Sequence, residues 1–274
     1  MGPVRHGCFL VARCIAGPLS ELSRVTSPST VQIAICSSHT RSNWYRGAGP
    51  VVRVAVPLDR SGGEVAALAT SFLAVLPSEV LARVAAEAVP AGLGAGQLLY
   101  EPEFSVIVEG RVRAFIADPS GRQLTVGYLS ASSAVGLARL AGRRYPTAFQ
   151  GLAPTRLLRV GDERFTELIR GYPRLGWAAA EEISTHLDGV EAELARVAFK
   201  SLRQRLAYHL LALLPANQDD HLPVHQAQLA AAVGSVREVV ARSLAPLRQE
   251  GLVEVGPAGI VVSDRLALAR LAGS

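Results

Sequence analysis

The chain has 274 residues, of which 49% are hydrophobic and 19% charged, so most of it should fold, and two domains fit into this length. The formal net charge of +5 allows an anionic partner such as nucleic acid without requiring one. An odd number of cysteines (Cys8, Cys14 and Cys36) provides no disulfide framework, which suits a reducing cytoplasm. Because no apolar run approaches the ~20 residues that cross a bilayer, we expect a cytoplasmic protein with no membrane partner.

Residues 1–60 are rich in Ser, Gly, Pro and Arg and lack a sustained period, which predicts a poorly ordered N-terminal extension. We expect a first domain over residues 61–172. It begins with a helical pattern broken at Pro77, and Ser78 is the expected N-cap of the second helix. Short strand patterns separated by turn signals follow at 96–104, 105–118, 122–129, 147–150 and 155–160. Their spacing predicts an antiparallel β-roll or barrel, with a mixed sheet as the alternative.

A long helix is predicted from Pro173, over residues 173–200. Apolar side chains recur on it at alternating steps of four and three, which is the pattern of a coiled-coil seam: Ile183, Leu187, Val190, Leu194 and Val197. A seam of this kind requires a partner helix, so we expect a parallel homodimer. The alternative is a helix that lies on the core of its own domain.

The seam lapses at Ser201, which is placed to cap a new helix and to form a hinge before a last domain, 201–274. Within it, two short helical patterns meet at Gly234, whose conformational freedom suits the turn of a helix-turn-helix. Arg237, Glu238 and Arg242 share one side of the second helix. Arg bonds guanine at two atoms and Glu accepts from the cytosine amino group, so this face predicts contact with bases of double-stranded DNA.

The alternative for this face is a solvated surface with local ion pairs. Pro246 falls inside the predicted reading helix, where a proline costs about 3 kcal/mol, but beyond the turns that would contact bases.

These features together resemble the Crp/Fnr family of bacterial transcription regulators, over roughly residues 65–274. The resemblance is strongest in the sequence VGSVREVVARSLAPLRQEGLVEV. It implies an α+β fold with an N-terminal β-roll sensor domain like those that bind cyclic nucleotides, a dimerisation helix and a C-terminal winged helix-turn-helix. It also implies that Arg237, Glu238 and Arg242 contact bases of a TGTGA-like half-site and that Gln226 and Ser235 lie near phosphates. Residues Gly256–Gly259 resemble the turn of the wing, and RNA polymerase is the implied further partner.

The effector pocket departs from the family's pattern for cyclic AMP. Leu137, next to Gly136, replaces a carboxylate that would hold the ribose, and leucine cannot accept a hydrogen bond. Tyr145 aligns with the phosphate-binding arginine, although Arg144 is adjacent. The loop after Tyr100 is short, and Val190 and Glu191 align with the polar pair that would face adenine. These departures argue against cyclic AMP, and we predict no particular cofactor.

Other cofactors have little support in the sequence. Three cysteines do not supply the four ligands of an iron–sulfur cluster, and the nearest candidate to bind haem is His186 on the long helix. Neither a nucleotide-binding glycine loop nor a nucleophile–base arrangement is evident, so we do not expect an enzyme. The predicted function is a homodimeric DNA-binding regulator with a degenerate or retuned pocket. The alternative is a small-molecule-sensing module that signals through protein contacts, with a vestigial DNA-binding domain.

Overall fold

The computed structural model describes residues 63–141, 146–214 and 220–273. The predicted N-terminal extension with its three cysteines, and the predicted pocket residue Arg144, lie outside the described residues. The described residues belong to one compact unit of the chain.

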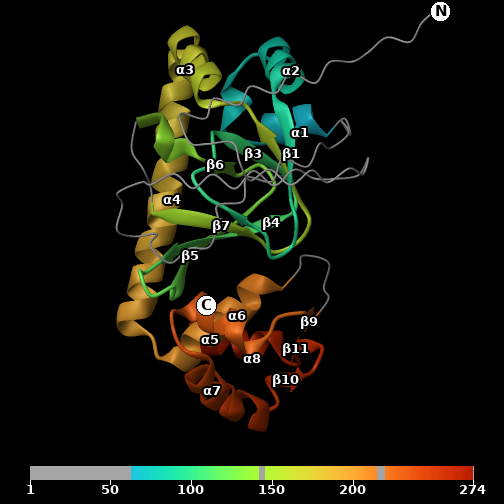
Figure 1. Ribbon diagram of the computed structural model, residues 1–274, viewed down its shortest axis with the longest axis vertical. Coiled ribbons are helices and arrows are strands. Elements are labelled where there is room, and N and C mark those ends of the chain that lie inside the picture. Colours follow the sequence, from blue (N-terminus) through green and yellow to red (C-terminus); the bar gives the residue numbers. More distant parts are fainter. Residues whose placement is uncertain (1–62, 142–145, 215–219, 274) are drawn as a thin grey trace, which may run out of the picture. The chain divides into compact units, whose positions relative to one another are not determined.

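Eight short strands build two antiparallel sheets, which together form a β-roll (Figure 1). The strand order is β1-β8-β3-β6 in one sheet and β2-β7-β4-β5 in the other. The strands are β1 (Val89–Leu93), β2 (Leu98–Leu99), β3 (Ser105–Glu109), β4 (Arg111–Ala117), β5 (Gln123–Ser130), β6 (Ala134–Val135), β7 (Thr147–Gly151) and β8 (Thr155–Arg159). All their described pairings are antiparallel, which confirms the prediction of an antiparallel roll over a mixed sheet.

Two details at the start of the roll correct the sequence prediction. Ser78 is the first residue of helix α2 (Ser78–Glu87) and not its cap, because Pro77 takes the N-cap position and no side chain caps the helix. The strand expected at 96–104 is only the two-residue β2, whereas β1 forms where no strand was expected. Pro90 within β1 is tolerated because β1 is the edge strand of its sheet, where a missing amide donor leaves no neighbour unpaired.

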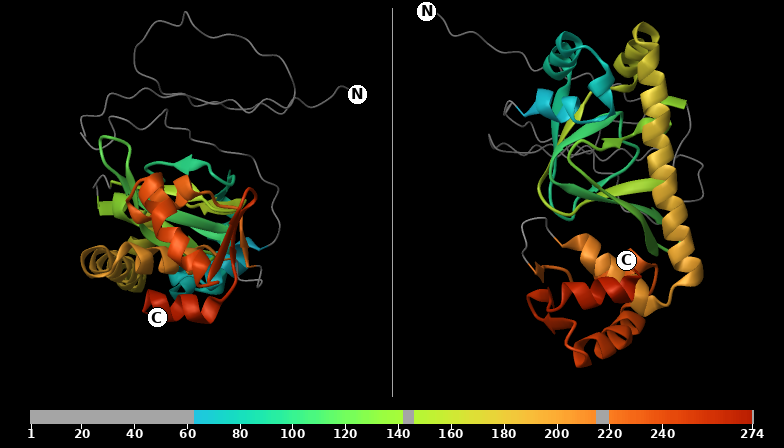
Figure 2. Two further views of the ribbon diagram at one scale, coloured as in Figure 1. Left: turned by 90° about the horizontal axis from the view of Figure 1, so that it is seen from below. Right: turned by 180° about the vertical axis from the view of Figure 1, so that it is seen from behind.

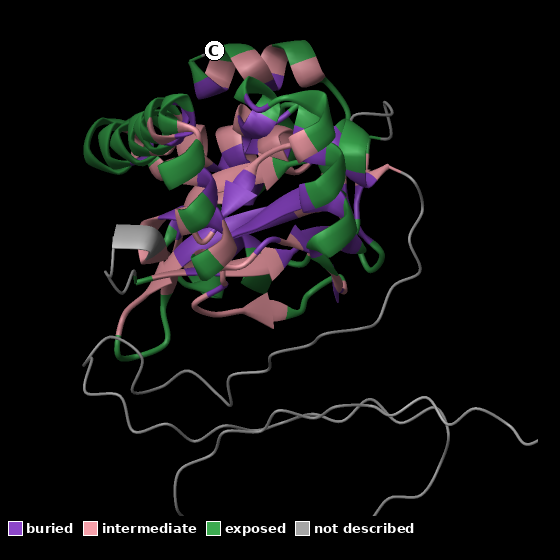
Figure 3. Cartoon of the chain, turned by 90° about the horizontal axis from the view of Figure 1, so that it is seen from above, coloured by how far each residue is buried: buried purple, intermediate pink, exposed green. Residues whose placement is uncertain are grey.

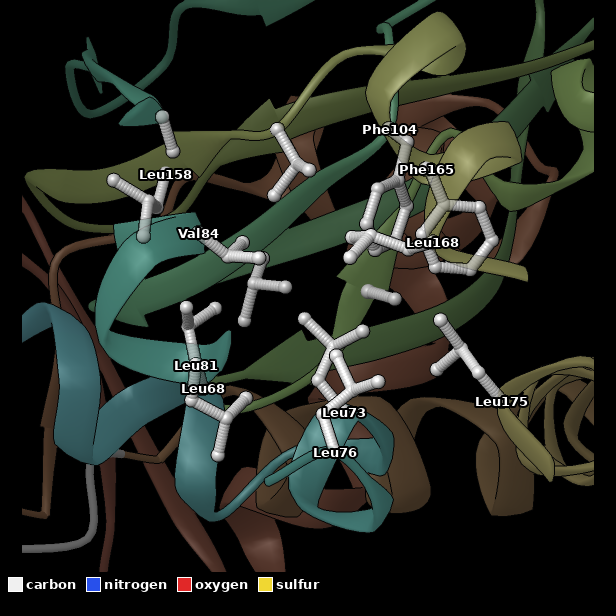
Figure 4. Close-up of a cluster of buried hydrophobic side chains, with 14 of the residues drawn as sticks. Leu68, Leu73, Leu76, Leu81, Val84, Phe104, Leu158, Phe165, Leu168 and Leu175 are labelled. Atoms are coloured by element: carbon white, nitrogen blue, oxygen red, sulfur yellow. The ribbon is translucent and has the colours of Figure 1, made fainter. Parts of the chain in front are cut away.

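Helices pack on one side of the roll over a hydrophobic core that includes Phe104 and Phe165 (Figure 4). Phe104 and Phe165 are fully buried with ring centroids 4.1 Å apart, and Phe72 meets both edge-on at 5.9 Å. Burying each of the Phe104 and Phe165 rings contributes roughly 1.5–3 kcal/mol. The helices that supply this core are α1 (Glu64–Ala69), the 3₁₀ helix η2 (Phe72–Val75), α2, α3 (Asp162–Gly171) and the start of α4 (Pro173–Phe199). We refer to the strands and helices from α1 to α3 as the β-roll domain.

Helix α4 runs for 27 residues and packs against η2, the 3₁₀ helix η3 (Leu137–Ala141) and β5 (Figure 2). Near its start, Leu175, Ala178 and Ala179 are buried in the core of the β-roll domain. Most of the helix after them is exposed, as Figure 3 shows. The five heptad positions are among the exposed large hydrophobic residues: Ile183, Leu187, Val190, Leu194 and Val197. The alternative of a helix lying on its own core therefore applies to the first turns of α4 and not to the heptad seam.

A second domain follows α4, and we call α5 to α8 the C-terminal domain. Lys200 and Ser201 have extended backbones, and Ser201 forms a capping box with Gln204, which confirms the predicted cap. Four helices and a small sheet of order β10-β11-β9 enclose a separate hydrophobic core. They are α5 (Leu202–Leu213), β9 (His221–Leu222), α6 (Gln226–Val233), α7 (Arg237–Gln249), β10 (Val253–Gly256), β11 (Gly259–Val262) and α8 (Arg265–Ala272).

The hairpin of β10 and β11 closes at the predicted turn, where Gly256 pairs with Gly259. No helix among the described residues combines the length and the apolar character that a membrane span requires.

Candidate nucleic-acid interface

A tight turn joins α6 to α7. Gly234 ends α6 in the left-handed conformation, with φ 65° and ψ 39°, which residues with a Cβ adopt only with strain. The amides of Gly234 and Ser235 both donate to the carbonyl of Ala230, and α7 begins at Arg237. The predicted helix-turn-helix turn at Gly234 is confirmed.

The three predicted reading residues stand on the first two turns of α7. Arg237, Glu238 and Arg242 are all exposed. None of the three takes part in an ion pair within the described part of the chain, whereas Arg203 of α5 pairs with Glu250 just after α7. The alternative of a solvated surface with local ion pairs is therefore not supported at these three positions. Two arginines and one carboxylate remain available to a ligand on one side of the helix.

The opposite side of α7 holds the helix on its domain. Val240, Leu244 and Leu247 are buried, and their spacing of four and three places them on one face. Pro246 lies inside α7, and the helix nevertheless continues to Gln249. Pro246 has no amide to donate to the carbonyl of Arg242, one turn earlier, so α7 lacks one hydrogen bond there.

The two residues predicted to lie near phosphates are placed at helix starts. Gln226 is the first residue of α6, and Ser235 lies in the turn just before α7; both are half-buried. No side chain caps α7 at its N-cap residue Val236. Uncapped amides at the start of a helix attract anionic oxygens such as those of a phosphate.

An open cavity of about 990 Å³ lies between the β-roll domain and α4. Its wall is mainly apolar and comes largely from β5, the segment around the start of η3 and the middle of α4, with Tyr208 from the middle of α5. Gly136, Leu137 and Val190, which the sequence placed in the effector pocket, line this cavity. Glu191 is exposed and is not among the lining residues.

Two polar residues of the cavity wall were not singled out as a pair from the sequence. Glu182 and His186 stand one turn apart on α4, and Oε1 of Glu182 lies 3.3 Å from Nε2 of His186. The hydrogen bond from His186 holds the pKa of Glu182 below its usual value, although burial opposes this. The same oxygen accepts from the Ala134 amide. Their i, i+4 spacing on the long helix is the signal that could have identified them.

A buried histidine connects the C-terminal domain to the β-roll domain. His209 of α5 is 0% exposed, and its Nδ1 lies 2.9 Å from the hydroxyl of Tyr128 in β5. Its Nε2 lies 3.4 Å from Oε1 of Glu193 in α4, at ion-pair distance but without hydrogen-bond geometry. Burial lowers the pKa of His209, and the Glu193 carboxylate offsets this only in part. The ring is therefore neutral at neutral pH.

Acid should weaken the folded state through His209. The folded-state pKa of the ring lies below its ordinary value of 6.5, so the unfolded chain binds a proton more readily. The free energy of unfolding therefore keeps its full value above about pH 6.5, and it decreases as the pH falls from there towards the folded-state pKa of His209. The groups that face the ring are Tyr128 of β5, Glu193 and Arg196 of α4, and Arg205 and Tyr208 of α5.

We expect the urea midpoint of unfolding to fall between about pH 7.5 and about pH 5.5, and to fall less in His209→Gln. If the urea midpoint fell by the same amount between these pH values in both proteins, a group other than His209 would cause the loss of stability.

A β-roll, a long helix with an exposed apolar seam, and a winged helix-turn-helix whose Arg237 and Arg242 are exposed together define a class of protein. This class is the DNA-binding transcription regulators that carry a sensor domain.

Comparisons with known proteins identify the family within this class. Residues 204–271 match the Crp-like helix-turn-helix domain. Over 179 residues the chain is 31% identical to the Cyclic AMP receptor protein of Thermus thermophilus, covering 65% of this chain and 80% of that protein. It is 26% identical over 175 residues to the Global nitrogen regulator of Synechocystis, covering 60% and 77% of the two chains.

Solved structures agree with these sequence matches. A CRP/FNR family transcriptional regulator from Thermus thermophilus superposes with a TM-score of 0.58 at 26% identity, covering 68% of this chain and 98% of that one. A putative crp/fnr family regulator from Eubacterium rectale shares the fold, with a TM-score of 0.66 at 20% identity over 74% of this chain and 98% of that one. The chain belongs to the Crp/Fnr family of transcription regulators, and it is a DNA-binding protein and not an enzyme.

Proposed function

We propose that the chain binds, as a homodimer, a two-fold symmetric DNA site with TGTGA-like half-sites. The observation that supports this most directly is the exposed set of Arg237, Glu238 and Arg242 on α7, which forms no ion pair with the residues that the structure describes. Arginine forms two hydrogen bonds to guanine and glutamate accepts one from cytosine, so the set matches a half-site that contains G·C pairs. Gln226, Ser235 and the uncapped start of α7 would hold the phosphates on either side.

Two copies are proposed because the seam of α4 is unpartnered in one chain. Five aliphatic residues along one face, each exposed by 37% or more, are costly to leave in water and match the a and d positions of a parallel coiled coil. A homodimer would present two α7 helices, as a symmetric site requires. On DNA, such a dimer would act on transcription through RNA polymerase, the partner that the family resemblance implies.

We propose further that the effector pocket is degenerate or retuned. The Thermus thermophilus relative is named as a receptor for cyclic AMP. In this chain Leu137, which the family resemblance aligns with a ribose-binding carboxylate, is buried and apolar, and Glu191 does not line the cavity. The cavity wall does carry other polar side chains, among them the paired Glu182 and His186. This set suits an effector other than cyclic AMP.

A gel-shift titration at fixed salt tests the proposal. The probe is a duplex with two inverted TGTGA half-sites one helical turn apart, roughly 34–36 Å centre to centre. The control duplex has the same composition with scrambled half-sites. We expect the symmetric duplex to bind at least about 1,000-fold more tightly than the control. Equal binding of both duplexes would contradict the proposal. Native mass spectrometry that then found a small molecule on the same protein would support the sensing module with a vestigial DNA-binding domain.

A further inference from the structure

The hairpin of β4 and β5 contacts the C-terminal domain at three separate places. The guanidinium of Arg111 donates to the carbonyl of Ala212 in the last turn of α5 and to that of Leu214, just after the helix, at 2.8 Å. The hydroxyl of Tyr128 meets His209 in the middle of α5. Leu124, the second residue of β5, lies against the turn at Gly234. One hairpin therefore touches both the first helix of the C-terminal domain and the turn from which the reading helix starts.

Tyr128 is the contact among these three that also lines the cavity. Arg196 of α4 and Tyr208 of α5 line it as well, with the Arg196 guanidinium stacked 3.7 Å above the Tyr208 ring. Arg196 donates to Glu193 at 2.9 Å, and Glu193 faces His209. The cavity wall and the polar contacts around His209 thus share residues and form one continuous set.

The hydrogen-bonding pattern around His209 is fixed by chemistry. A neutral imidazole has one N–H and one acceptor nitrogen. The negative charge of Glu193, 3.4 Å from Nε2, favours the tautomer that carries its N–H at Nε2, and this tautomer leaves Nδ1 to accept from the Tyr128 hydroxyl. Burial raises the pKa of Tyr128, so the phenol keeps the proton that this bond needs. A shift of Tyr128 would leave a fully buried acceptor unpaired, which favours movement of α5 along with it.

We propose that Tyr128 is the positioning residue that couples the cavity to the C-terminal domain. Filling the cavity beside Tyr128 shifts the tyrosine, and its hydrogen bond to His209 transmits the shift to α5. The coupling of the cavity to α5 does not depend on the proposed function. Only the consequence of the α5 movement for DNA binding rests on it.

A side chain can serve in place of the unidentified effector. Gly127 precedes Tyr128, lines the cavity, and has open space where its Cβ would lie. Gly127→Leu therefore adds an aliphatic group to the cavity without a backbone clash. Tyr128→Phe removes only the hydroxyl, and the two changes with their double mutant form a cycle. Tyr172 packs on the core of the β-roll domain, and Tyr172→Phe is the matched control for loss of a hydroxyl.

The readout is hydrogen–deuterium exchange of the α5 amides in the full chain without DNA, with thermal melting to verify folding. We expect exchange in α5 to rise about tenfold in Tyr128→Phe and to stay unchanged in Tyr172→Phe. Gly127→Leu should change α5 exchange in the wild-type background and by less than about twofold in the Tyr128→Phe background. Additive effects, or unchanged exchange in Tyr128→Phe, would overturn the coupling. The exchange results could follow the expected pattern in a protein that does not bind the symmetric duplex in preference to the scrambled one. That outcome would support the coupling and contradict only the proposed function.

Discussion

Arg237→Ala should weaken binding to the symmetric TGTGA-like duplex by about 1–3 kcal/mol for each half-site and relax the preference for one base pair. The reason is geometric. Arg237 is the first residue of α7, exposed and without an ion pair among the described residues, so the substitution removes donors that serve no other contact. Gel-shift titrations on the symmetric duplex, and on duplexes changed at each half-site position, measure both effects.

Arg248→Ala is the matched control for Arg237→Ala. Arg248 is also exposed and lies on the last turn of α7, so its loss changes the net charge equally. General electrostatic attraction to DNA would make the two substitutions equivalent and would reduce the salt dependence of both. Direct reading makes only the first one alter the ranking of half-site sequences. If Arg237→Ala lost no more affinity than Arg248→Ala and left that ranking unchanged, the assignment of Arg237 would be wrong.

The parts of the fold that the sequence predicted correctly are those with local causes. Gly234 takes a left-handed conformation that glycine alone adopts freely, and Ser201 and Gln204 are three residues apart in a capping box. The wing turn needs only Gly256–Gly259, and the exposed apolar face of α4 follows from a repeat along one helix. Each of these signals is complete within a few residues, so a single sequence displays it.

The parts that the sequence missed depend on partners far along the chain. β1, with the sequence VPAGL, forms because residues 89–93 pair with 155–159 of β8, and its own residues have little strand propensity. Tyr128 and His209 are 81 positions apart, and nothing near either residue indicates the other. Glu182 could not be recognised from the sequence as a cavity residue, because the cavity wall forms only when β5, η3 and α4 come together in the fold.

Leu194→Arg should convert the protein to a monomer and remove most of its affinity for the symmetric duplex. Leu194 is 68% exposed in the single chain, so the change leaves the packing of each domain intact. In a coiled-coil seam the same change would bury two facing charges without partners, which an interface of this kind does not tolerate. Loss of the linked second half-site should weaken binding by about 100- to 10,000-fold.

Ala192→Arg is the control for this substitution. Ala192 is exposed and, at 100° per residue, lies on the side of α4 opposite the seam, so the same charge there should leave the dimer intact. Native mass spectrometry reports the oligomeric state of both variants, and a duplex with one half-site reports whether the C-terminal domain still reads DNA. Because a monomer has lost only the second contact, the affinity of Leu194→Arg for one half-site should equal that of a single wild-type contact. A dimeric Leu194→Arg would show that the seam on α4 is not what joins the two copies, and the symmetric site would then need a different explanation.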